Sequence, residues 1–176
     1  MRTRHNQDLQ EMTEQPERNE LDNCIEYRLN GKLHRVDGPA IEWADGDKSW
    51  YIYGKLHRDN GPAIECTNGD KEWYLDGIIH RLDGPAVECA NGYKVWYVDG
   101  KCHRLDGPAN ETTDGYKAWY VDGKLHRLDG PAIECANGDK EWYISDRKVS
   151  KNEVDNRRLK ILTLSFVVNR RICKVI

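Results

Sequence analysis

The chain has 176 residues and a formal net charge of −3, with 38% hydrophobic and 32% charged residues. Six Trp and nine Tyr stand beside a single Phe, a composition that disfavours a thick aliphatic core and favours a thin, elongated structure held by aromatic ladders. No run of 18 apolar residues occurs, so the sequence predicts no transmembrane helix.

Residues 1–23 form a polar, acidic segment for which we expect a mobile or loosely helical structure. The first residues, MRTRHNQDLQEM, lack the apolar stretch of a secretory signal, so we expect a cytoplasmic location. Thiols stay reduced there, and no two cysteines form a CxxC pair. The cysteines are Cys24, Cys66, Cys89, Cys102, Cys135 and Cys173.

A 23-residue repeat fills residues 24–149 and is the dominant signal in the sequence. Five repeats can be drawn, and a degenerate sixth start follows them. The repeats are 27–49, 50–72, 73–95, 96–118 and 119–141. Two series of residues keep the spacing of 23: Trp50, Trp73, Trp96, Trp119 and Trp142, and His34, His57, His80, His103 and His126.

Glycines divide each repeat into short strands. All 15 glycines lie between Gly31 and Gly138 and mark three corners in each repeat. Between corners the residues alternate with a period of two, as in KVWYV at 94–98. A three-residue loop at 90–92, a type I turn with Gly in the bulge position, would pair Glu88 with Lys94, whereas a two-residue NG loop would lose that pair.

The number of corners leaves two architectures open. If the chain reversed at all three corners, each successive repeat would be inverted. Either one corner is a bend, which gives an antiparallel meander, or all three corners are bends, which gives a three-sided β-helix. In a β-helix the equivalents of Lys94 would stack at ~4.8 Å, where like charges repel; in a meander they lie roughly 9.6 Å apart, with opposite charges between them. The sequence therefore favours a mainly β, elongated antiparallel hairpin array.

The repeat resembles a known family. An aromatic start, then NGK, His, Gly and a final DG or NG turn are similar to the MORN repeat, and GKxHRxDGPAxE is closest to a MORN-like variant of uncharacterised phage, large-DNA-virus and bacterial proteins. The resemblance covers residues 27–149. It implies bent hairpins that contact proteins or, in some members, anionic lipids, and it suggests a viral or phage accessory or anti-defence protein.

The segment HRxDGPA places His, Arg and Asp together as an active site would, but five equivalent copies favour a structural role. Gly and Pro supply a tight bend, Asp can accept local hydrogen bonds, Arg can pair with Asp, and His is expected to pack on Trp or Tyr. Equivalent histidines lie too far apart to share a zinc ion. We therefore expect no catalytic residue, no metal site and no cofactor, and we expect the Trp series to form the core.

Tyrosines alternate with the Trp series and are expected to face a partner. A polar Asn110 also stands where other repeats have Ile or Val. Candidate partner-facing residues are Tyr51, Tyr74, Tyr97, Tyr120, Tyr143, Trp43 and Asn110. Specificity is expected where repeats differ, at Tyr53, Asp59, Asn60, Ile78, Cys102, Thr112 and Thr113 and at Ser49, Glu72, Val95, Ala118 and Glu141.

Residues 150–176 form a basic C-terminal segment. Ser150 and Glu153 make a capping-box pattern that predicts a helix at 151–162. Residues 147–176 carry a net +7, against −10 for residues 1–146. The segment could cap the open sheet edge, lie on an anionic membrane or bind the acidic repeats of another copy. The tail residues expected to contact lipid or a partner are Arg157, Arg158, Lys160, Phe166, Arg170, Arg171 and Lys174.

These observations predict a non-enzymatic repeat scaffold that presents an extended surface to a protein partner. The alternative is a membrane-surface adaptor that uses the basic apolar tail. Nucleic-acid binding is disfavoured because no basic stripe follows the repeats.

Overall fold

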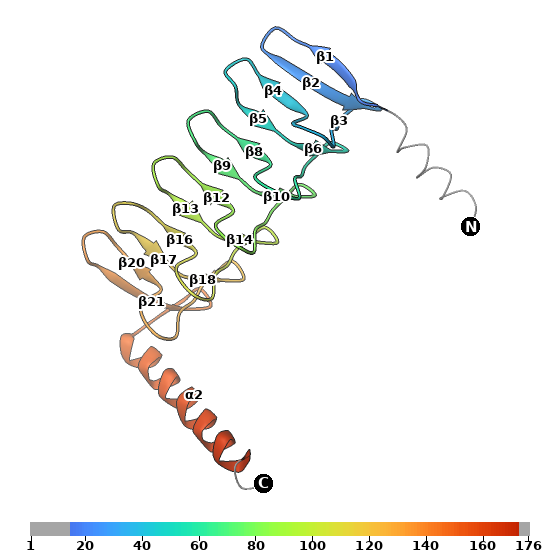
Figure 1. The fold of residues 1–176 in the computed structure, drawn as a ribbon. Coiled ribbons are helices and arrows are strands. Elements are labelled where there is room, and N and C mark those ends of the chain that lie inside the picture. Colours follow the sequence, from blue (N-terminus) through green and yellow to red (C-terminus); the bar gives the residue numbers. More distant parts are fainter. Residues whose placement is uncertain (1–14, 173–176) are drawn as a thin grey trace. The chain divides into compact units, whose positions relative to one another are not determined.

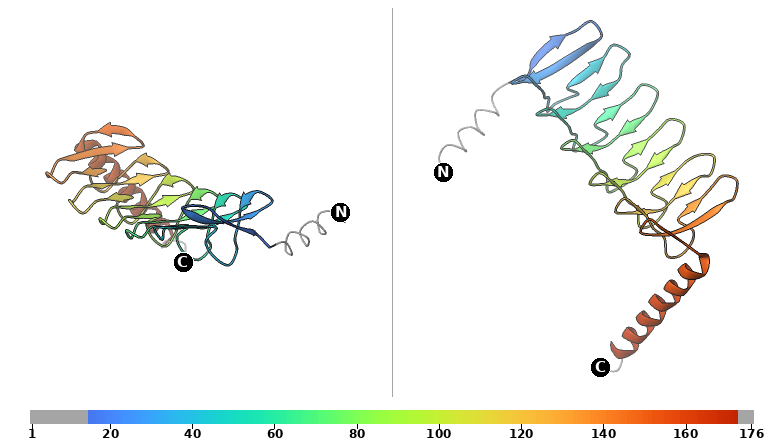
Figure 2. Two further views of the ribbon diagram at one scale, coloured as in Figure 1. Left: turned by 90° about the horizontal axis from the view of Figure 1, so that it is seen from above. Right: turned by 180° about the vertical axis from the view of Figure 1, so that it is seen from behind.

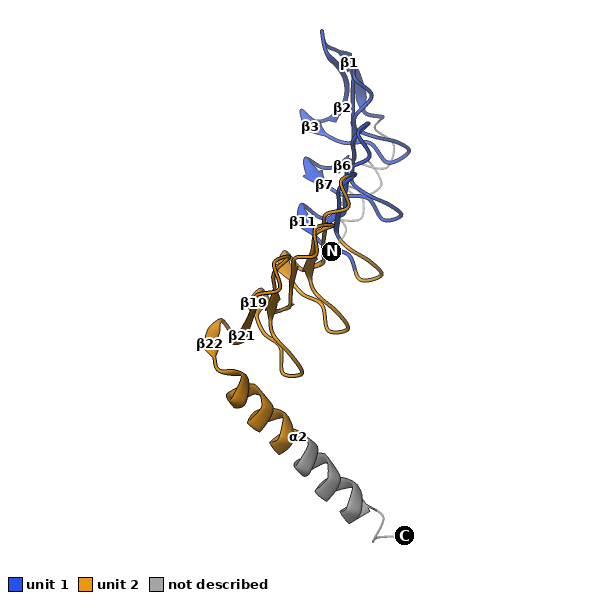
Figure 3. Cartoon of the chain, turned by 90° about the vertical axis from the view of Figure 1, so that its left-hand side faces the viewer, with its two compact units in different colours: residues 1–81, 86–90 blue, residues 82–85, 91–176 orange. Residues whose placement is uncertain are grey.

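The computed structural model describes the backbone of residues 15–172 and the side chains of residues 15–161. Within these residues the protein is mainly β, with 22 strands in antiparallel hairpins and one C-terminal helix. The chain divides into two compact units, residues 1–81 with 86–90 and residues 82–85 with 91–176 (Figure 3).

Unit 1 contains an antiparallel meander in the order β1-β2-β4-β5-β8-β9-β12, with short hairpins beside it. The short hairpins are β6-β7 and β10-β11, and β3 pairs with β2. The strands are β1 (Glu17–Glu20), β2 (Cys24–Leu29), β3 (Lys32–Leu33), β4 (Ile41–Trp43), β5 (Lys48–Ser49), β6 (Tyr51–Ile52), β7 (Lys55–Leu56), β8 (Ile64–Glu65), β9 (Lys71–Glu72), β10 (Tyr74–Leu75), β11 (Ile78–Ile79) and β12 (Val87–Glu88).

Unit 2 repeats this plan in the order β13-β16-β17-β20-β21-β22, with the short hairpins β14-β15 and β18-β19. Its elements are β13 (Lys94–Val95), β14 (Tyr97–Val98), β15 (Lys101–Cys102), β16 (Asn110–Glu111), β17 (Lys117–Ala118), β18 (Tyr120–Val121), β19 (Lys124–Leu125), β20 (Ile133–Glu134), β21 (Lys140–Ile144), β22 (Arg147–Val149) and α2 (Lys151–Ile172). Within each unit the hairpins stand side by side (Figure 1, Figure 2).

Each repeat contains two different hairpin turns. In the first, residues such as Asp76 and Gly77 both have positive φ, +51° and +81°, as a two-residue turn of a twisted hairpin requires. In the second, the Gly69 N–H donates to the Cys66 carbonyl, and the Cys66 N–H donates to the Asp70 carbonyl, each at 2.9 Å. This is the expected three-residue loop, with the bulge glycine at φ +99°.

The third corner, DGPA, is a bend between two hairpins and does not reverse the chain. All strand pairs recorded for the described residues are antiparallel. The meander prediction is therefore confirmed, and the alternative of a three-sided β-helix is wrong.

Opposite charges alternate across the meander as expected. In unit 1, Lys48 faces Glu42 on one neighbouring strand and Glu65 on the other. In unit 2, Lys117 faces Glu111 and Glu134 in the same way. Because each Lys lies between two Glu residues, the register avoids the like-charge stacking that parallel coils would impose.

The buried core differs from the expected one. The Trp series is only half-buried. The fully buried positions instead include the alanines of the DGPA bends, which have no exposed surface: Ala40, Ala63, Ala86, Ala109 and Ala132. Only a small side chain fits there because the backbones meet at the bend; the Trp119 N–H, for example, donates to the Ala132 carbonyl at 2.8 Å.

Both ends of the chain depart from the sequence expectations. Part of segment 1–23 is ordered as a strand, β1, which pairs with β2 from Glu17 opposite Arg28 to Glu20 opposite Ile25. A backbone edge can recruit a polar strand without any hydrophobic alternation, and charged residues are typical of such edges. At the other end α2 runs to Ile172 and not to about 162, since no Gly or Pro interrupts it.

Candidate functional site

The Arg of HRxDGPA stacks on the aromatic ring that begins its own repeat. The Arg58 Cζ atom lies 3.8 Å from the centre of the Trp50 ring, and Arg127 lies 3.8 Å from the Trp119 ring. Arg35 takes the same position over Tyr27 at 4.0 Å. A guanidinium packs flat on an aromatic face and is attracted to its negative charge. Four rings of the Trp series are therefore covered by Arg, and not by His as the sequence suggested: Trp50, Trp73, Trp96 and Trp119.

The same guanidinium ties the bend to the sheet. In the last repeat, Arg127 donates to the Pro131 carbonyl at 3.2 Å, to Asp129 at 2.7 Å and to Glu134 at 3.3 Å. This Arg–Asp pairing confirms the prediction, and it holds the pKa of Asp129 below its usual range. Arg35 and Arg104 make equivalent bonds to Asp37 and Asp106.

In three bends a residue larger than glycine would displace the Arg. A Cβ placed on Gly38, Gly107 or Gly130 would lie 2.8–2.9 Å from the Cζ atom of the Arg in the same bend. The Arg is thus held between an aromatic ring and a glycine backbone. In the second repeat Asn60 replaces Asp, and Gly61 adopts a different conformation with φ +137°.

The histidines connect successive repeats. His57 Nδ1 accepts a hydrogen bond of 3.1 Å from the Asp76 N–H in the two-residue turn of the next repeat. His34 and His103 accept in the same way from Tyr53 and Asp122. The proton of each neutral ring must then sit on Nε2. The expected ring packing occurs at His34, whose ring centroid lies 4.4 Å from that of Tyr53.

The His-Arg-Asp segment is therefore a structural clamp in the repeats where these contacts are recorded. Its Arg, Asp and Gly fold the bend onto the aromatic ring, and its His holds the next turn. The side chains are engaged in the same way from repeat to repeat, which is not the arrangement of a single reactive centre.

One face of each meander carries the tyrosines, and we call it the tyrosine face. Directly opposed residues in a sheet point to the same side, and so do residues two apart in a strand. Ile133 faces Glu141, which precedes Tyr143 by two residues within β21, so all three lie on this face. Ser49 faces Ile64 at the equivalent positions of unit 1, and Tyr51 begins the short hairpin that follows. The face comprises Trp43, Ser49, Tyr51, Ile64, Glu72 and Tyr74 in unit 1, and Tyr93, Val95, Tyr97, Asn110, Tyr116, Ala118, Tyr120, Glu141 and Tyr143 in unit 2.

Hydrogen bonds confirm that neighbouring side chains share this face. The Tyr74 hydroxyl donates to Glu72 at 2.8 Å, and the Tyr143 hydroxyl donates to Glu141 at 2.8 Å. These glutamates are two of the positions that vary between repeats. The other three, in contrast, are buried: Ser49, Val95 and Ala118.

The sequence analysis missed two tyrosines of unit 2. Tyr93 and Tyr116 hold a position that is Asp in the other repeats and lie on the same face. Burial raises the pKa of Tyr116 and of Tyr120, and the nearby Tyr93 raises both pKa values further. The replacement of Asp by Tyr at a turn could have identified them, because a bulky aromatic residue has no conformational advantage in a turn.

Asn110 lies among these tyrosines. Its Nδ2 donates to the Tyr93 hydroxyl at 3.3 Å. Its Oδ1 is buried and has no hydrogen-bond partner among the described residues. Trp43, the other non-tyrosine candidate, lies in β4 opposite Cys24 and is half-buried.

Helix α2 is attached to unit 2 by its first turn. The Glu153 N–H donates to Ser150 Oγ at 3.2 Å, which confirms the Ser150 cap. Val154 is buried, and α2 contacts β21. Residues 155–161, which include Arg157, Arg158 and Lys160, are all exposed. The side chains of Phe166, Arg170 and Arg171, and all of Lys174, lie outside the described residues.

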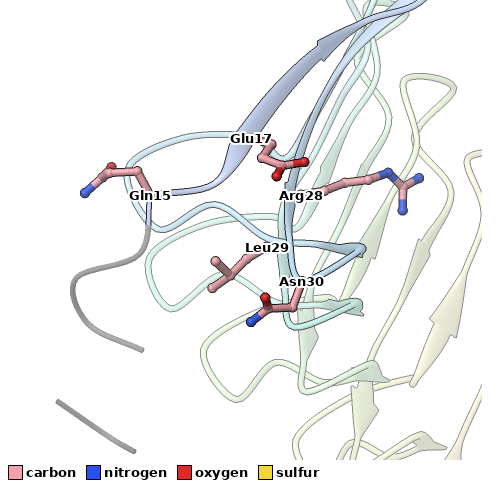
Figure 4. A pocket seen from close by; sticks show the side chains of 5 residues that line it. All are labelled: Gln15, Glu17, Arg28, Leu29 and Asn30. Carbon is pink, nitrogen blue, oxygen red and sulfur yellow. The ribbon is translucent and has the colours of Figure 1, made fainter. Parts of the chain in front are cut away.

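The described part of the chain shows no other cluster of side chains typical of a binding or catalytic site. A cavity of about 310 Å³ beside β1 and β2 is lined by Gln15, Glu17, Arg28, Leu29 and Asn30, and the side chains of Gln15 and Arg28 point in different directions (Figure 4). No three His, Cys, Asp or Glu side chains in residues 15–161 are grouped to hold a metal ion. Over the same described stretch, no helix has the length and apolar character of a membrane span.

The chain matches no protein-family model, and a search of curated proteins returns no match.

Proposed function

We propose that the protein is a non-enzymatic, cytoplasmic repeat scaffold that binds a protein partner through its tyrosine face. One observation supports this above others. The polar groups of HRxDGPA are used in the same structural bonds from repeat to repeat, whereas the tyrosine face is half-exposed and changes its composition along the chain.

Tyrosine suits such a surface because it offers a large, rigid contact area and a hydroxyl that can find a partner. In unit 2 the face is richest, with five half-buried tyrosines. Their half-buried neighbours differ in polarity, with Asn110 in one repeat and Ile133 and Glu141 further along, so the repeats present different contacts. A partner would be recognised by this order of side chains along the face.

The proposal is tested by capture of partners with two matched double variants of full-length protein. Tyr97→Ser with Tyr120→Ser changes the tyrosine face of unit 2. Lys94→Ser with Lys117→Ser changes exposed positions on the opposite face of the preceding strands, β13 and β17. A partner retained by the wild type and the Lys variant, but lost from the Tyr variant, is expected. A partner lost equally from both, with folding intact by circular dichroism, contradicts the proposal.

A catalytic role for the His-Arg-Asp segment would require one repeat to differ from the rest. His103→Ala and His57→Ala are expected to have similar, purely structural effects. Loss of an activity from one of these variants alone would contradict the scaffold proposal.

A second candidate function is a membrane-surface adaptor, which the exposure of α2 supports. Leu159 and Ile161 are 60% and 51% exposed and alternate with Arg157, Arg158 and Lys160. Basic residues beside exposed apolar ones suit an anionic lipid surface. Flotation with vesicles containing phosphatidylserine, lost when the chain is shortened to end at Val149 and absent with neutral vesicles, is the result that this candidate requires.

A further inference from the structure

The outer side of the HRxDGPA bends in unit 2 carries a line of leucines, which we call the leucine row: Leu82, Leu105 and Leu128. Leu82 and Leu105 are 79% and 80% exposed, although large aliphatic side chains normally avoid water. Equivalent positions in successive repeats of a meander are roughly 9.6 Å apart. The row is thus a line of regularly spaced apolar side chains.

The leucine row is a feature of unit 2. At the same position unit 1 has Val36 and the acidic Asp59. Val36 is 82% exposed, so the bend leaves this side chain in water in unit 1 as well. Leu128 is the exception, because it is half-buried in the last repeat, where α2 begins.

The leucine row is bordered by acidic groups. Asp106 and Asp129 follow Leu105 and Leu128, and their side chains are 85% and 69% exposed. The paired guanidinium groups of Arg104 and Arg127 are largely covered, at 23% and 21% exposed. What the surface presents is therefore apolar and negative.

Helix α2 has the complementary character. Beyond Val154 its described side chains, residues 155–161, are exposed on every side. They include the basic Arg157, Arg158 and Lys160 and the apolar Leu159 and Ile161. Residues three and four apart share a helix face, so Arg157 and Arg158 lie on the same side of α2 as Ile161, whereas Leu159 lies on another side. Most helices in water are stabilised by packing of an apolar face, whereas Ile161, on the face shared with Arg157 and Arg158, keeps 51% of its surface exposed.

We propose that two copies of the chain associate by docking the 157–161 stretch of α2 from one copy on the leucine row of the other. The contact places Arg157 and Arg158 beside the exposed Asp106 and covers Ile161 together with Leu82 and Leu105. The same pairing already begins within one chain, where Arg158 lies close enough to Asp129 to act on its charge.

A second copy explains the two exposed surfaces together. The helix of the same chain is fixed by Ser150, Val154 and an ion pair between Arg147 and Glu153, and it leaves Leu82 and Leu105 exposed. An anionic membrane would cover α2 but would repel the acidic border of the leucine row. The proposal is separate from partner binding on the tyrosine face.

Sedimentation equilibrium of the full-length protein over a micromolar concentration series tests the docking. The wild type is expected to form dimers or larger assemblies, more weakly at high salt. Leu82→Ser with Leu105→Ser removes the row, and Ile161→Asp with Arg158→Glu alters the helix. Each variant alone should associate at least about tenfold more weakly. Val36→Ser, at an equally exposed bend of unit 1, is the matched control and should associate like the wild type.

Mixing the two variants gives the decisive result. The row variant keeps an intact helix and the helix variant keeps an intact row, so the mixture should form a mixed complex that neither forms alone. A wild type that stays monomeric, a row variant that associates normally, or a mixture that stays monomeric would each overturn the proposal. Flotation of a monomeric wild type with anionic vesicles through α2 would assign the helix to the membrane instead. Circular dichroism checks that each variant is folded.

Discussion

The guanidinium of Arg104 lies over the Trp96 ring, with its Cζ atom 4.0 Å from the ring centre. The same group donates to Asp106 at 2.9 Å and to the Pro108 carbonyl at 3.2 Å. One side chain therefore joins the strand that begins a repeat to the bend in its middle. Other repeats contain the same contact. The HRxDGPA segment, which looks most catalytic in the sequence, therefore holds the two hairpins of a repeat together.

Replacement of Arg104 by Lys is expected to lower the free energy of unfolding by about 1–2 kcal/mol, because an ammonium cannot stack flat on Trp96 and donate in a fork at the same time. Urea unfolding followed by Trp fluorescence measures the loss. Lys94→Arg, an exposed change of the same kind in the opposite direction, should have no comparable effect. Equal stability of Arg104→Lys and wild type would show that the stack contributes little.

Gly130→Ala is expected to destabilise the protein by about 1–3 kcal/mol through overpacking. The added Cβ would lie 2.9 Å from the Arg127 Cζ and would push the guanidinium off its ring. In an Arg127→Ala background the same substitution should cost much less, because the side chain that it meets is gone. A double-mutant cycle from urea unfolding gives this coupling; additive effects would place the cost in the backbone and not in the Arg contact.

The periodic parts of the fold could be predicted from the sequence. Glycine spacing marked the corners, and the requirement that Glu88 meet Lys94 selected the three-residue loop. The same register is observed at Glu65 with Lys71 and at Glu111 with Lys117. Counting chain reversals then selected the meander. These steps depend on local turn geometry and strand pairing, and the same evidence for both recurs in every repeat.

The contacts across the bend could not be predicted. Arg127 is eight residues from Trp119, a separation that belongs to neither a strand nor a helix, so only the shape of the DGPA bend brings them together. The prediction of the core was wrong for a similar reason. An Ala such as Ala132 belongs to no hydrophobic pattern in the sequence, yet it is buried because the backbones converge at the bend. The strand at Glu17–Glu20 depends on a free backbone edge, which side-chain patterns do not reveal.

Acidification is expected to reduce stability through His34. Burial lowers the pKa of this ring below its usual value of 6.5, so the unfolded chain binds the proton more readily than the folded protein. The stability that His34 contributes is complete above about pH 6.5 and is lost as the pH falls toward its folded pKa. The protonated ring also cannot accept from the Tyr53 N–H.

The His34→Asn variant provides the comparison, since an amide oxygen can accept the same hydrogen bond without titrating. The difference in unfolding free energy between wild type and variant should shrink from pH 7 to pH 5. Parallel pH profiles for the two proteins would show that other groups cause the acid sensitivity.

Cys102 is expected to be the slowly reacting thiol of the repeats. Burial raises its pKa to about 11, and it packs in the β14-β15 hairpin opposite Tyr97. Only the thiolate reacts, so at pH 8 nearly all of this side chain is inert. In a variant that keeps Cys102 alone, labelling by a disulfide reagent should be slow and should accelerate up to about pH 11. Rapid labelling at pH 7 would show that the hairpin opens readily.

Asn110→Ile is expected to stabilise the protein by about 1 kcal/mol, because the variant removes a buried polar atom that lacks a hydrogen bond and restores the aliphatic residue of the equivalent Ile64 and Ile133. Urea unfolding measures the gain. If the tyrosine face binds a partner, the same variant should bind that partner more weakly, since it removes the amide that donates to the Tyr93 hydroxyl on this face. Ile64→Val, a mild change at the equivalent position of unit 1, serves as the control for both measurements. A variant that is less stable and binds equally well would mean that Asn110 serves the packing of unit 2 alone.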